Sequence, residues 1–547
     1  MNPKLAILDY VILSAYVLFL ILVGYYFSRQ KKQTTAEYLL GSRRIPWWAA
    51  GISTYVALMS TLSLVAVPGE AFNHGISLLA TSFISPFCAI AACFIFLRFY
   101  FKAEKFTPYS YLENRFDIRV KTFTASMFWI MRLMYLGVVL YSCAKVFEGA
   151  AGWSPWFSIL LIGIICIIYT FLGGLKAVIW TDVTQFVIIF GALVLVLVMV
   201  VVKLPFGLVG IIDYSFKHGR GFEYFKDPNF YGFSPFIRLN LWVLIFSAFV
   251  SEMFNYSADQ TGIQKLLSTS SYKQAKKSVF TYAVICLPIS ILSYLIGLAV
   301  FAFYSHNPLP NGLPPGDLAL FHFISTQLRA PMPGLIIAGF LAAAMTTLGA
   351  GLNGLATVAT KDFYLQYFTS AASEQRQVNF SKISTAVVGV LVVGIGLIIA
   401  SANQRIGQTM IEVASLWFAY FTPIWVIFLL GVTTTRITAK HIFVCIGLSW
   451  VFTTLMIIWY LISKDTDKPL SFMLIGLPGT MIMIIIGYLF ACFSKPLDSS
   501  KTSGLTLWTL NKKGNPEPDV FRGNQSISSK SHCPISLNGG KINADRL

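Results

Sequence analysis

The sequence of 547 residues carries little charge: 12% of the residues are Asp, Glu, Lys or Arg, against roughly 25% in an ordinary soluble domain. Hydrophobic residues make up 56% of the chain. Apolar runs recur along it, and many reach the ~20 residues that cross a ~30 Å hydrocarbon core. These proportions exclude a soluble enzyme, a disordered protein and a disulfide scaffold. They predict an all-α polytopic membrane protein.

Several motifs of catalytic and energy-coupling chemistry are also missing. The sequence has no GxxxxGK[ST] phosphate loop, no HExxH and no GxSxG. Its six histidines are scattered, and its eight cysteines form no CxxC, so we interpret the cysteines as apolar filler. We therefore expect neither an enzyme nor an ATP-driven pump, and no cofactor or metal besides a coupling ion. Secondary transport is favoured by elimination.

The apolar runs predict about thirteen transmembrane helices. Their approximate bounds are 9–27, 47–67, 77–100, 123–147, 155–172, 183–203, 239–259, 278–304, 334–360, 381–402, 408–432, 441–463 and 470–493. We expect one transmembrane domain over 1–493, with a core at about 47–432 and extra helices at 9–27, 441–463 and 470–493. A polar segment at 494–547 follows, which its composition predicts to be a disordered cytoplasmic tail.

The formal net charge of +18 is unevenly distributed. Most Lys and Arg residues lie in the segments that follow odd-numbered spans. Because positive residues mark the cytoplasmic side, we expect an external amino terminus and a cytoplasmic carboxyl terminus in the plasma membrane. The charge then reflects topology and contact with anionic lipids of the bilayer. No nucleic-acid partner is expected, and the oligomeric state stays open.

Polar groups inside the spans mark the candidate sites, because such groups are costly in hydrocarbon. In span 7, one helical face carries Glu252, Asn255, Tyr256 and Asp259. A solvated face is the ordinary explanation of such a stripe. Here, however, a membrane-spanning run at 239–250 precedes it. The pattern favours a polar face that lines an aqueous cavity, with the helix unwound nearby.

Span 2 carries five hydroxyl residues between Ser53 and Ser63 and ends in Val67-Pro68-Gly69-Glu70. Small hydroxyl residues can simply tighten helix packing, but this density, with Gly and Pro at the flanks, favours a broken helix. Unwound backbone exposes carbonyls that can bind a hard cation such as sodium. Spans 2 and 7 are five apart, which is the spacing expected of a transporter built from two inverted five-helix repeats.

Two further segments are weaker signals by themselves. Span 9 contains AAAMTTLGAGLN, in which Thr346 and Thr347 could permit a close helix crossing or present two hydroxyls to a cation. The segment GGLKAVIWTDVTQ opens span 6 after a Gly-Gly turn. There, Thr181 or Asp182 could act locally as a helix cap.

Together these segments resemble the sodium:solute symporter family. The resemblance rests on GGLKAVIWTDVTQ, on AAAMTT…LN in span 9 and on STLSLVAVPGEAF at the end of span 2, and it extends over roughly residues 5–490. It implies a LeuT-like 5+5 inverted-repeat core preceded by one extra helix. It also implies sodium-coupled import of a small organic solute by alternating access.

The resemblance further implies a sodium site made of backbone carbonyls and adjacent hydroxyls. The matching positions are Val56, Met59 and Ala343 for the carbonyls and Thr346 and Thr347 for the hydroxyls. Asp182 matches an acidic residue near the inner end of the sodium path. Where some members bind a second sodium, this chain has Gly349 and Ala350, which carry no side-chain oxygen. Because a desolvated cation needs replacement ligands, we predict one sodium per cycle.

The implied solute cavity is less specific. Its matching positions are Ser60, Ser63, Glu252, Asn255, Tyr256, Ser415 and Trp417. In span 4, Arg132 and Tyr135 share a face, and members that carry sialic acid place a carboxylate-binding arginine near the Tyr135 position. Arg132 either binds a carboxylate of the solute or pairs with a carboxylate such as Glu252. The expected solute is therefore a carboxylate or a sugar-like molecule.

Alternative functions stay open at this point. A proton-coupled symporter would use Glu252 or Asp182 as the proton carrier. A channel would show currents that do not saturate with solute. A transporter-like sensor would need a signalling module, and the polar tail contains none that we recognise.

Overall fold

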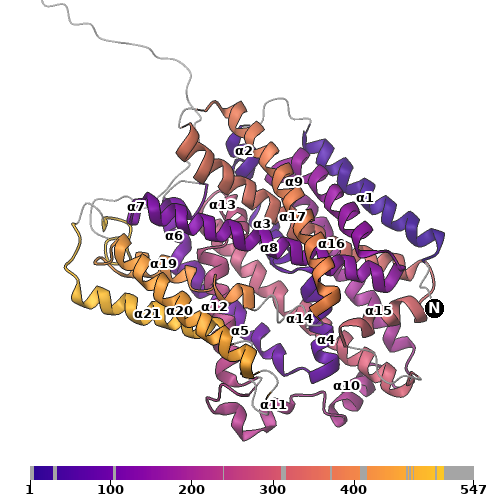
Figure 1. The fold of residues 1–547 in the computed structure, drawn as a ribbon. Coiled ribbons are helices and arrows are strands. Elements are labelled where there is room, and N and C mark those ends of the chain that lie inside the picture. Colours follow the sequence, from indigo (N-terminus) through magenta and orange to yellow (C-terminus); the bar gives the residue numbers. More distant parts are fainter. Residues whose placement is uncertain are drawn as a thin grey trace, which may run out of the picture. The chain divides into compact units, whose positions relative to one another are not determined.

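The computed structural model describes residues 5–28, 34–102, 106–237, 239–309, 316–369, 372–406, 416–463, 466, 470–471, 474–498 and 502–510. Over these residues the secondary structure is helical, without strands (Figure 1). The helices up to the middle of the chain are α1 (Ile7–Ser28), α2 (Thr35–Leu40), α3 (Trp47–Leu58), α4 (Thr61–His74), α5 (Ala80–Ala92), α6 (Arg98–Lys102), α7 (Tyr109–Arg115), α8 (Ile118–Ala151), α9 (Pro155–Val202), α10 (Gly207–Lys217), α11 (Glu223–Lys226), α12 (Leu241–Ser257) and α13 (Gln260–Leu267).

The remaining α-helices are α14 (Tyr272–His306), α15 (Gly316–Gln327), α16 (Met332–Val358), α17 (Glu374–Ile406), α19 (Ile424–Thr433), α20 (Ala439–Ser463) and α21 (Gly476–Phe493). Five short helical segments of other types are η1 (Gly41–Arg43), η2 (Ser77–Leu79), η3 (Cys93–Leu97), η4 (Pro228–Tyr231) and η5 (Ala359–Phe368). Two of these, η3 and η5, are π-helical and continue α5 and α16.

Ten helices in the described part of the chain are long and apolar enough to cross a membrane, and the count rises to twelve if each of two bent helix pairs forms one span. One of the ten, α9, has 48 residues. At 1.5 Å per residue it is roughly twice as long as a single crossing requires. Gly174 interrupts it with φ 60° and ψ −166°. Dividing α9 there gives the two spans that the sequence predicts at 155–172 and 183–203.

Gly174 tolerates this backbone conformation because it has no Cβ. A Cβ at this position would also lie 2.8 Å from the backbone oxygen of Tyr38. The Gly-Gly sequence therefore permits both the positive φ and the close approach of α2 to the turn.

Two helices are broken in the middle, as predicted for spans 2 and 7. The axes of α3 and α4 differ by 66°, and those of α12 and α13 differ by 55°. After each break a side chain caps the new helix: Ser60 accepts from the Ser63 N–H at 3.4 Å, and Asp259 accepts from the Thr261 N–H at 2.8 Å. Such caps replace hydrogen bonds that a break removes. The architecture is that of the expected LeuT-like fold.

Helix α16 forms the centre of the bundle and packs against α3, α8, α9 and α17 (Figure 1). In an apolar 18-residue stretch of the span Met332–Phe368, which comprises α16 and η5, 94% of the residues are buried inside the protein. A helix that is apolar on all sides is expected in such a position. Its small residues permit close packing, because a Cβ on Gly339 would lie 2.3 Å from the Cβ of Ala192 on α9.

The end of the membrane domain extends past the expected boundary at residue 493. Residues 502–510 lie against the ends of α7 and α19, where the Leu507 N–H donates to Val432 at 2.8 Å and the Tyr111 hydroxyl donates to Leu505 at 2.7 Å. This ordered stretch differs from the expectation of disorder from residue 494. The rest of the predicted tail, 511–547, lies outside the described residues.

The packing of α14 on α4 makes a first prediction. A Cβ on Gly297 would lie 2.3 Å from the backbone oxygen of Pro68, whereas one on Gly394 of α17 would meet nothing within 4 Å. Gly297→Ala should therefore lower the free energy of unfolding by about 1–3 kcal/mol through overpacking. The matched control Gly394→Ala should be neutral or stabilising. Thermal melting of the purified variants in detergent measures the order, and equal melting temperatures would contradict this account of the packing.

Candidate functional site

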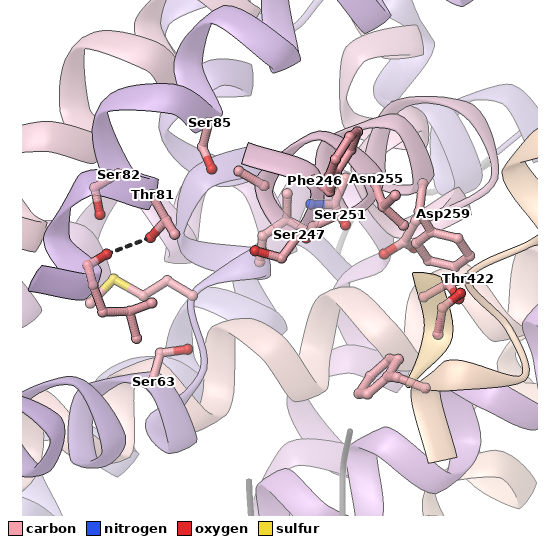
Figure 2. A pocket seen from close by; sticks show the side chains of 18 of the residues that line it. Ser63, Thr81, Ser82, Ser85, Phe246, Ser247, Ser251, Asn255, Asp259 and Thr422 are labelled. Atoms are coloured by element: carbon pink, nitrogen blue, oxygen red, sulfur yellow. Dashed lines mark hydrogen bonds between the residues drawn. The ribbon is translucent and has the colours of Figure 1, made fainter. Parts of the chain in front are cut away.

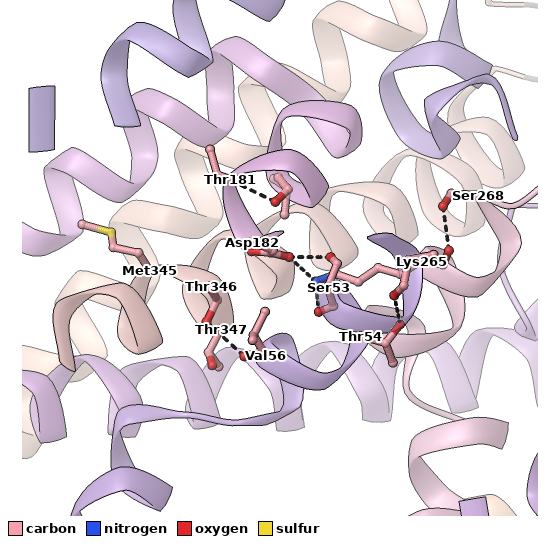
Figure 3. Close-up of polar contacts among 12 residues, drawn as sticks. Ser53, Thr54, Val56, Thr181, Asp182, Lys265, Ser268, Met345, Thr346 and Thr347 are labelled. Atoms are coloured by element: carbon pink, nitrogen blue, oxygen red, sulfur yellow. Dashed lines mark hydrogen bonds and ion pairs between the residues drawn. The ribbon is translucent and has the colours of Figure 1, made fainter. Parts of the chain in front are cut away.

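Five oxygen atoms in two hydrogen-bonded groups lie beside the break between α3 and α4. They belong to the carbonyls of Val56, Met59 and Ala343 and to the hydroxyls of Thr346 and Thr347. Thr346 Oγ1 lies 3.0 Å from Val56 O and 2.9 Å from Ala343 O. Thr347 Oγ1 lies 3.2 Å from Met59 O, and both threonines are fully buried (Figure 3). The structure thus brings together the five residues matched to sodium ligands.

The break itself makes the Val56 and Met59 carbonyls available. In an uninterrupted helix the Ser60 N–H would donate to Val56 O, but Met59 and Ser60 have extended backbones, with ψ of 105° and 167°. The last carbonyls of α3 therefore lack partners within their own helix. Thr346 has one hydroxyl hydrogen for two carbonyls. The excess of acceptor lone pairs over hydrogens suits a hard cation, which oxygen ligands bind best.

Gly349 and Ala350, one turn further along α16, have surroundings that differ from those of Thr346 and Thr347. A Cβ on Gly349 would lie 2.0 Å from the hydroxyl oxygen of Tyr169. Ala350 belongs to a small apolar cluster with Ala57 and Val178. Neither position offers a side-chain oxygen of its own.

A buried ion pair lies one turn away from the five oxygens along α3. Lys265 Nζ donates to Asp182 Oδ2 at 2.6 Å and to the Ser53 backbone oxygen at 2.8 Å. The Ser53 hydroxyl donates to the same Asp182 oxygen at 2.6 Å (Figure 3). Both charged side chains are 1% exposed. Asp182, which the resemblance placed on the sodium path, thus has an ammonium partner that connects α3, α9 and α13.

Asp182 does not cap a helix, which corrects one local alternative considered from the sequence. The helix after Gly174 begins before Asp182, and Asp182 lies inside it. Thr181 does not cap the helix either, because its hydroxyl donates back to the carbonyls of Ala177 and Val178 at 2.9 Å. The Trp-Thr-Asp segment therefore lies on a helix interior.

The sequence does not single out Lys265, which follows the span predicted at 239–259, among the basic residues expected on the cytoplasmic side. In the structure it lies on α13, whose eight residues are all buried. The apolar spacing of Ile263, Leu266 and Leu267 was a usable signal for a helix there. Burial of the lysine itself depends on Asp182 in a distant segment, and periodicity carries no information about such a partner.

A cavity of about 660 Å³ lies beside these groups. Its walls come from α3, α4, α5, α8, α12, α14, the segment 418–422 before α19 and the start of α21 (Figure 2). Four predicted solute-site residues line it: Ser63, Arg132, Tyr135 and Asn255. Ser60, Glu252, Tyr256 and Trp417 do not. Ser415 lies outside the described residues. The cavity also reaches Met59, whose carbonyl is one of the five oxygens.

The polar residues of span 7 face two different surroundings, the cavity and the helix α14. Asn255 and Asp259 line the cavity, whereas Glu252 accepts a hydrogen bond from Tyr282 on α14 at 3.0 Å. The ring of Tyr256 also lies against Tyr282, with centroids 5.9 Å apart. At about 100° per residue, positions i, i+3 and i+4 cover a broad arc. Side chains at its two edges can therefore face different surroundings.

Arg132 pairs with Asp259, not with Glu252 as the sequence analysis considered. Its Nη1 lies 3.3 Å from Asp259 Oδ2, and both side chains are 5% exposed or less. The guanidinium also stacks over the ring of Tyr135 at 5.1 Å. Its Nε and Nη2 atoms are buried without a partner among the described residues. Arg132 also lines the cavity, so a rotation of its side chain that turns these N–H groups toward the cavity would let the guanidinium bind a carboxylate.

Two broken helices around a central cavity, with freed carbonyls at one break, are the arrangement of a secondary transporter with inverted repeats. The chain belongs to the sodium:solute symporter family, whose model matches residues 38–446. This membership confirms the predicted function, sodium-coupled symport of a small organic solute, and gives the chain sodium and a solute as partners. The family and the relatives are transporters.

Individual relatives match over most of the chain. A sodium/sialic acid symporter of Aliivibrio fischeri is 29% identical over 503 residues, which cover 91% of this chain and 96% of the relative. The human sodium-coupled monocarboxylate transporter 1 is 27% identical, covering 78% of this chain and 69% of the relative. A solved substrate-bound, outward-open sodium-coupled sialic acid symporter superposes with a TM-score of 0.77 at 27% identity, covering 90% of this chain and 99% of that one.

The ion pair makes a second prediction. Asp182→Asn should lower the free energy of unfolding by roughly 3–5 kcal/mol, because it leaves Lys265 buried without a countercharge. The double variant with Lys265→Met should recover most of that loss, since neither charge is then buried. Melting temperatures of the two single variants and the double variant complete the cycle. Additive losses in the double variant would show that the two side chains do not stabilise each other.

Proposed function

We propose that one sodium ion binds among the Val56, Met59 and Ala343 carbonyls and the Thr346 and Thr347 hydroxyls, and that its binding drives solute uptake. The convergence of these five oxygens at a helix break supports the proposal. The ion would replace hydrogen bonds that now join the hydroxyls to the carbonyls. Because Met59 also lines the cavity, the same residue contacts both the ion and the space for the solute.

We also propose a stoichiometry of one sodium per cycle, which the surroundings of Gly349 and Ala350 support. Gly349 and Ala350 offer no oxygen ligands, and the Tyr169 hydroxyl fills the space beside Gly349. We assign Asp182 a positioning role, in which its carboxylate holds Lys265 and the Ser53 turn of α3 in place near the inner end of the ion's path.

The solute that fits the cavity best is a carboxylate. The Nε and Nη2 groups of Arg132, which have no partner among the described residues, would bind a carboxylate once the side chain turns them toward the cavity, and Ser63 and Asn255 add neutral polar groups that suit hydroxyls. A sugar acid such as sialic acid, named in the relatives, combines both features. A neutral sugar would use only the second set.

We infer that the protein spans the plasma membrane with its amino terminus outside and its carboxyl terminus in the cytoplasm. The distribution of Lys and Arg supports this orientation. It places α3, α13 and their buried ion pair in the cytoplasmic half. The cavity, which α4 and α12 help to line, then lies on the external side.

Sodium binding can be tested without knowing the solute. A ligand that binds the folded state raises the melting temperature, and the stabilisation grows with the logarithm of the ligand concentration relative to its Kd. Thr346→Ala combined with Thr347→Val removes two of five ligands and should raise the apparent sodium Kd at least tenfold, about 1.4 kcal/mol. The purified protein would be melted across a sodium chloride series, with choline chloride maintaining the ionic strength.

The matched control is the Thr346→Ser, Thr347→Ser variant. It keeps both oxygens and should retain the parental sodium dependence within about threefold. Should the Ala/Val variant show that parental dependence as well, the ion would bind elsewhere and the assignment would fail.

Arg132 tests the solute class. In Arg132→Met, Asp259→Asn, both partners of the ion pair become neutral, so no buried charge is left unpaired. Loss of charge-assisted hydrogen bonds should weaken binding of N-acetylneuraminate or lactate by at least tenfold, while sodium-dependent stabilisation persists. Binding is measured by thermal shift in saturating sodium, with Lys217→Met, Asp213→Asn, which neutralises an exposed ion pair outside the cavity, as the control. Parental carboxylate affinity in the double variant, or binding of glucose but no acid by the parent, would exclude the carboxylate proposal.

A further inference from the structure

A second, smaller cavity lies away from the transport path. It has a volume of about 320 Å³ and is formed by the end of α5, the π-helical segment η3 and the first turns of α14. Its lining combines basic and apolar residues: Ile90, Cys93, Phe94, Lys273, Lys276, Lys277, Val279 and Phe280. The proposed sodium and solute sites use none of these residues.

The basic side of this groove carries three lysines within two turns of α14. None of the three forms an ion pair with a carboxylate in the part of the chain that the structure describes. Aromatic rings hold two of them: Lys276 Nζ lies 4.9 Å from the Tyr272 centroid, and Lys277 Nζ lies 5.8 Å from the Trp47 ring. The amino-terminal end of the long helix α14 adds the positive end of its dipole. The groove therefore attracts an anion.

The other side of the groove is apolar and exposed. Phe94 is 57% exposed and Phe280 is 63% exposed. Both lie within segments that are long and apolar enough to cross the membrane, so hydrocarbon chains are their natural surroundings. A ligand that contacts both sides must have a negative head and an apolar body.

The groove also lies at the depth of a membrane surface. The three lysines begin one spanning helix, and Arg98 and Lys102 end the neighbouring one. Basic residues at adjacent helix ends form the pockets in which anionic lipid head groups bind on the cytoplasmic side. The distribution of charge along the chain places this end of α14 on that side.

We propose that the groove is a binding site for an anionic phospholipid of the cytoplasmic leaflet. The phosphate contacts Lys273, Lys276 and Lys277, and an acyl chain lies over Phe94 and Phe280. Bound there, the lipid connects η3 to α14. The same part of α14 packs tightly on α3, where a Cβ on Gly51 would lie 2.6 Å from the Ser278 oxygen. The lipid therefore supports the helix whose far end supplies the Val56 carbonyl.

Titration of a fluorescent phosphatidylglycerol into the delipidated, full-length protein in detergent tests this site. Unlabelled phosphatidylglycerol should displace the probe, whereas phosphatidylcholine and inorganic phosphate should not at equal concentration. The Lys273→Gln, Lys276→Gln, Lys277→Gln variant should weaken probe binding at least tenfold. Phe280→Ser should weaken it while leaving the three lysines intact.

The matched control removes the same charge from exposed positions outside the groove, as Arg436→Gln, Lys440→Gln, Lys495→Gln. It should bind the probe within twofold of the parent, and its melting temperature reports whether charge loss alone affects folding. Equal weakening in the control, or equal competition by phosphatidylcholine, would overturn the proposal. Displacement by inorganic phosphate alone would reduce the groove to an anion site without a lipid. These outcomes are independent of sodium coupling.

Discussion

Backbone hydrogen bonding in a membrane is the constraint on which this structure depends. Within hydrocarbon, a broken helix must find new partners for the carbonyls and N–H groups that the break releases. At the break between α3 and α4, the Thr346 and Thr347 hydroxyls supply those partners for Val56 and Met59. The same oxygens are the ligands of the proposed sodium site. The stability of the break and the proposed ion binding therefore depend on the same atoms. Small residues and burial of α16 allow its hydroxyls to reach the break.

The second helix break and the helix α13 that follows it supply one residue to each of two buried ion pairs. Asp259 caps the start of α13 and holds Arg132 at the cavity wall. Lys265, in the last turn of the same helix, holds Asp182 and the Ser53 turn of α3. A helix of eight residues thus carries one buried pair at the solute cavity and another beside the ion-binding helix. A displacement of α13 would change both pairs together, which would link the cavity to the proposed ion site.

Much of this fold is predictable from the sequence, because hydrocarbon imposes a strict pattern. Length, low charge and apolar runs predict the helical membrane domain, and the hydroxyl-rich end of span 2 predicts its break. The break at Asp259 is predictable as well, because a polar stripe inside an apolar span is costly in hydrocarbon and therefore marks a cavity or an unwound helix. The role of the adjacent Thr346 and Thr347 hydroxyls as sodium ligands was inferred from resemblance to a family. The structure places these hydroxyls opposite the matched carbonyls.

What the sequence left open concerns pairing between distant segments. A helical stripe could not show that Glu252 faces Tyr282 while Asn255 faces the cavity. The choice of Asp259 over Glu252 as the partner of Arg132 depends on how α12 ends and α13 begins. Lys265 was counted as a cytoplasmic charge, because a buried lysine is stable only beside a carboxylate that lies elsewhere in the chain. Such contacts follow from the packing of several helices at once.

The most direct test of the central claim is a pair of experimental structures, one in saturating sodium chloride and one in choline chloride. The account predicts an ion in the sodium structure bound to the Val56, Met59 and Ala343 carbonyls and to both threonine hydroxyls, with the hydroxyl-to-carbonyl hydrogen bonds lost. The choline structure should keep those hydrogen bonds. A sodium-saturated structure in which Thr346 still donates to Val56, with the ion bound elsewhere, would contradict it.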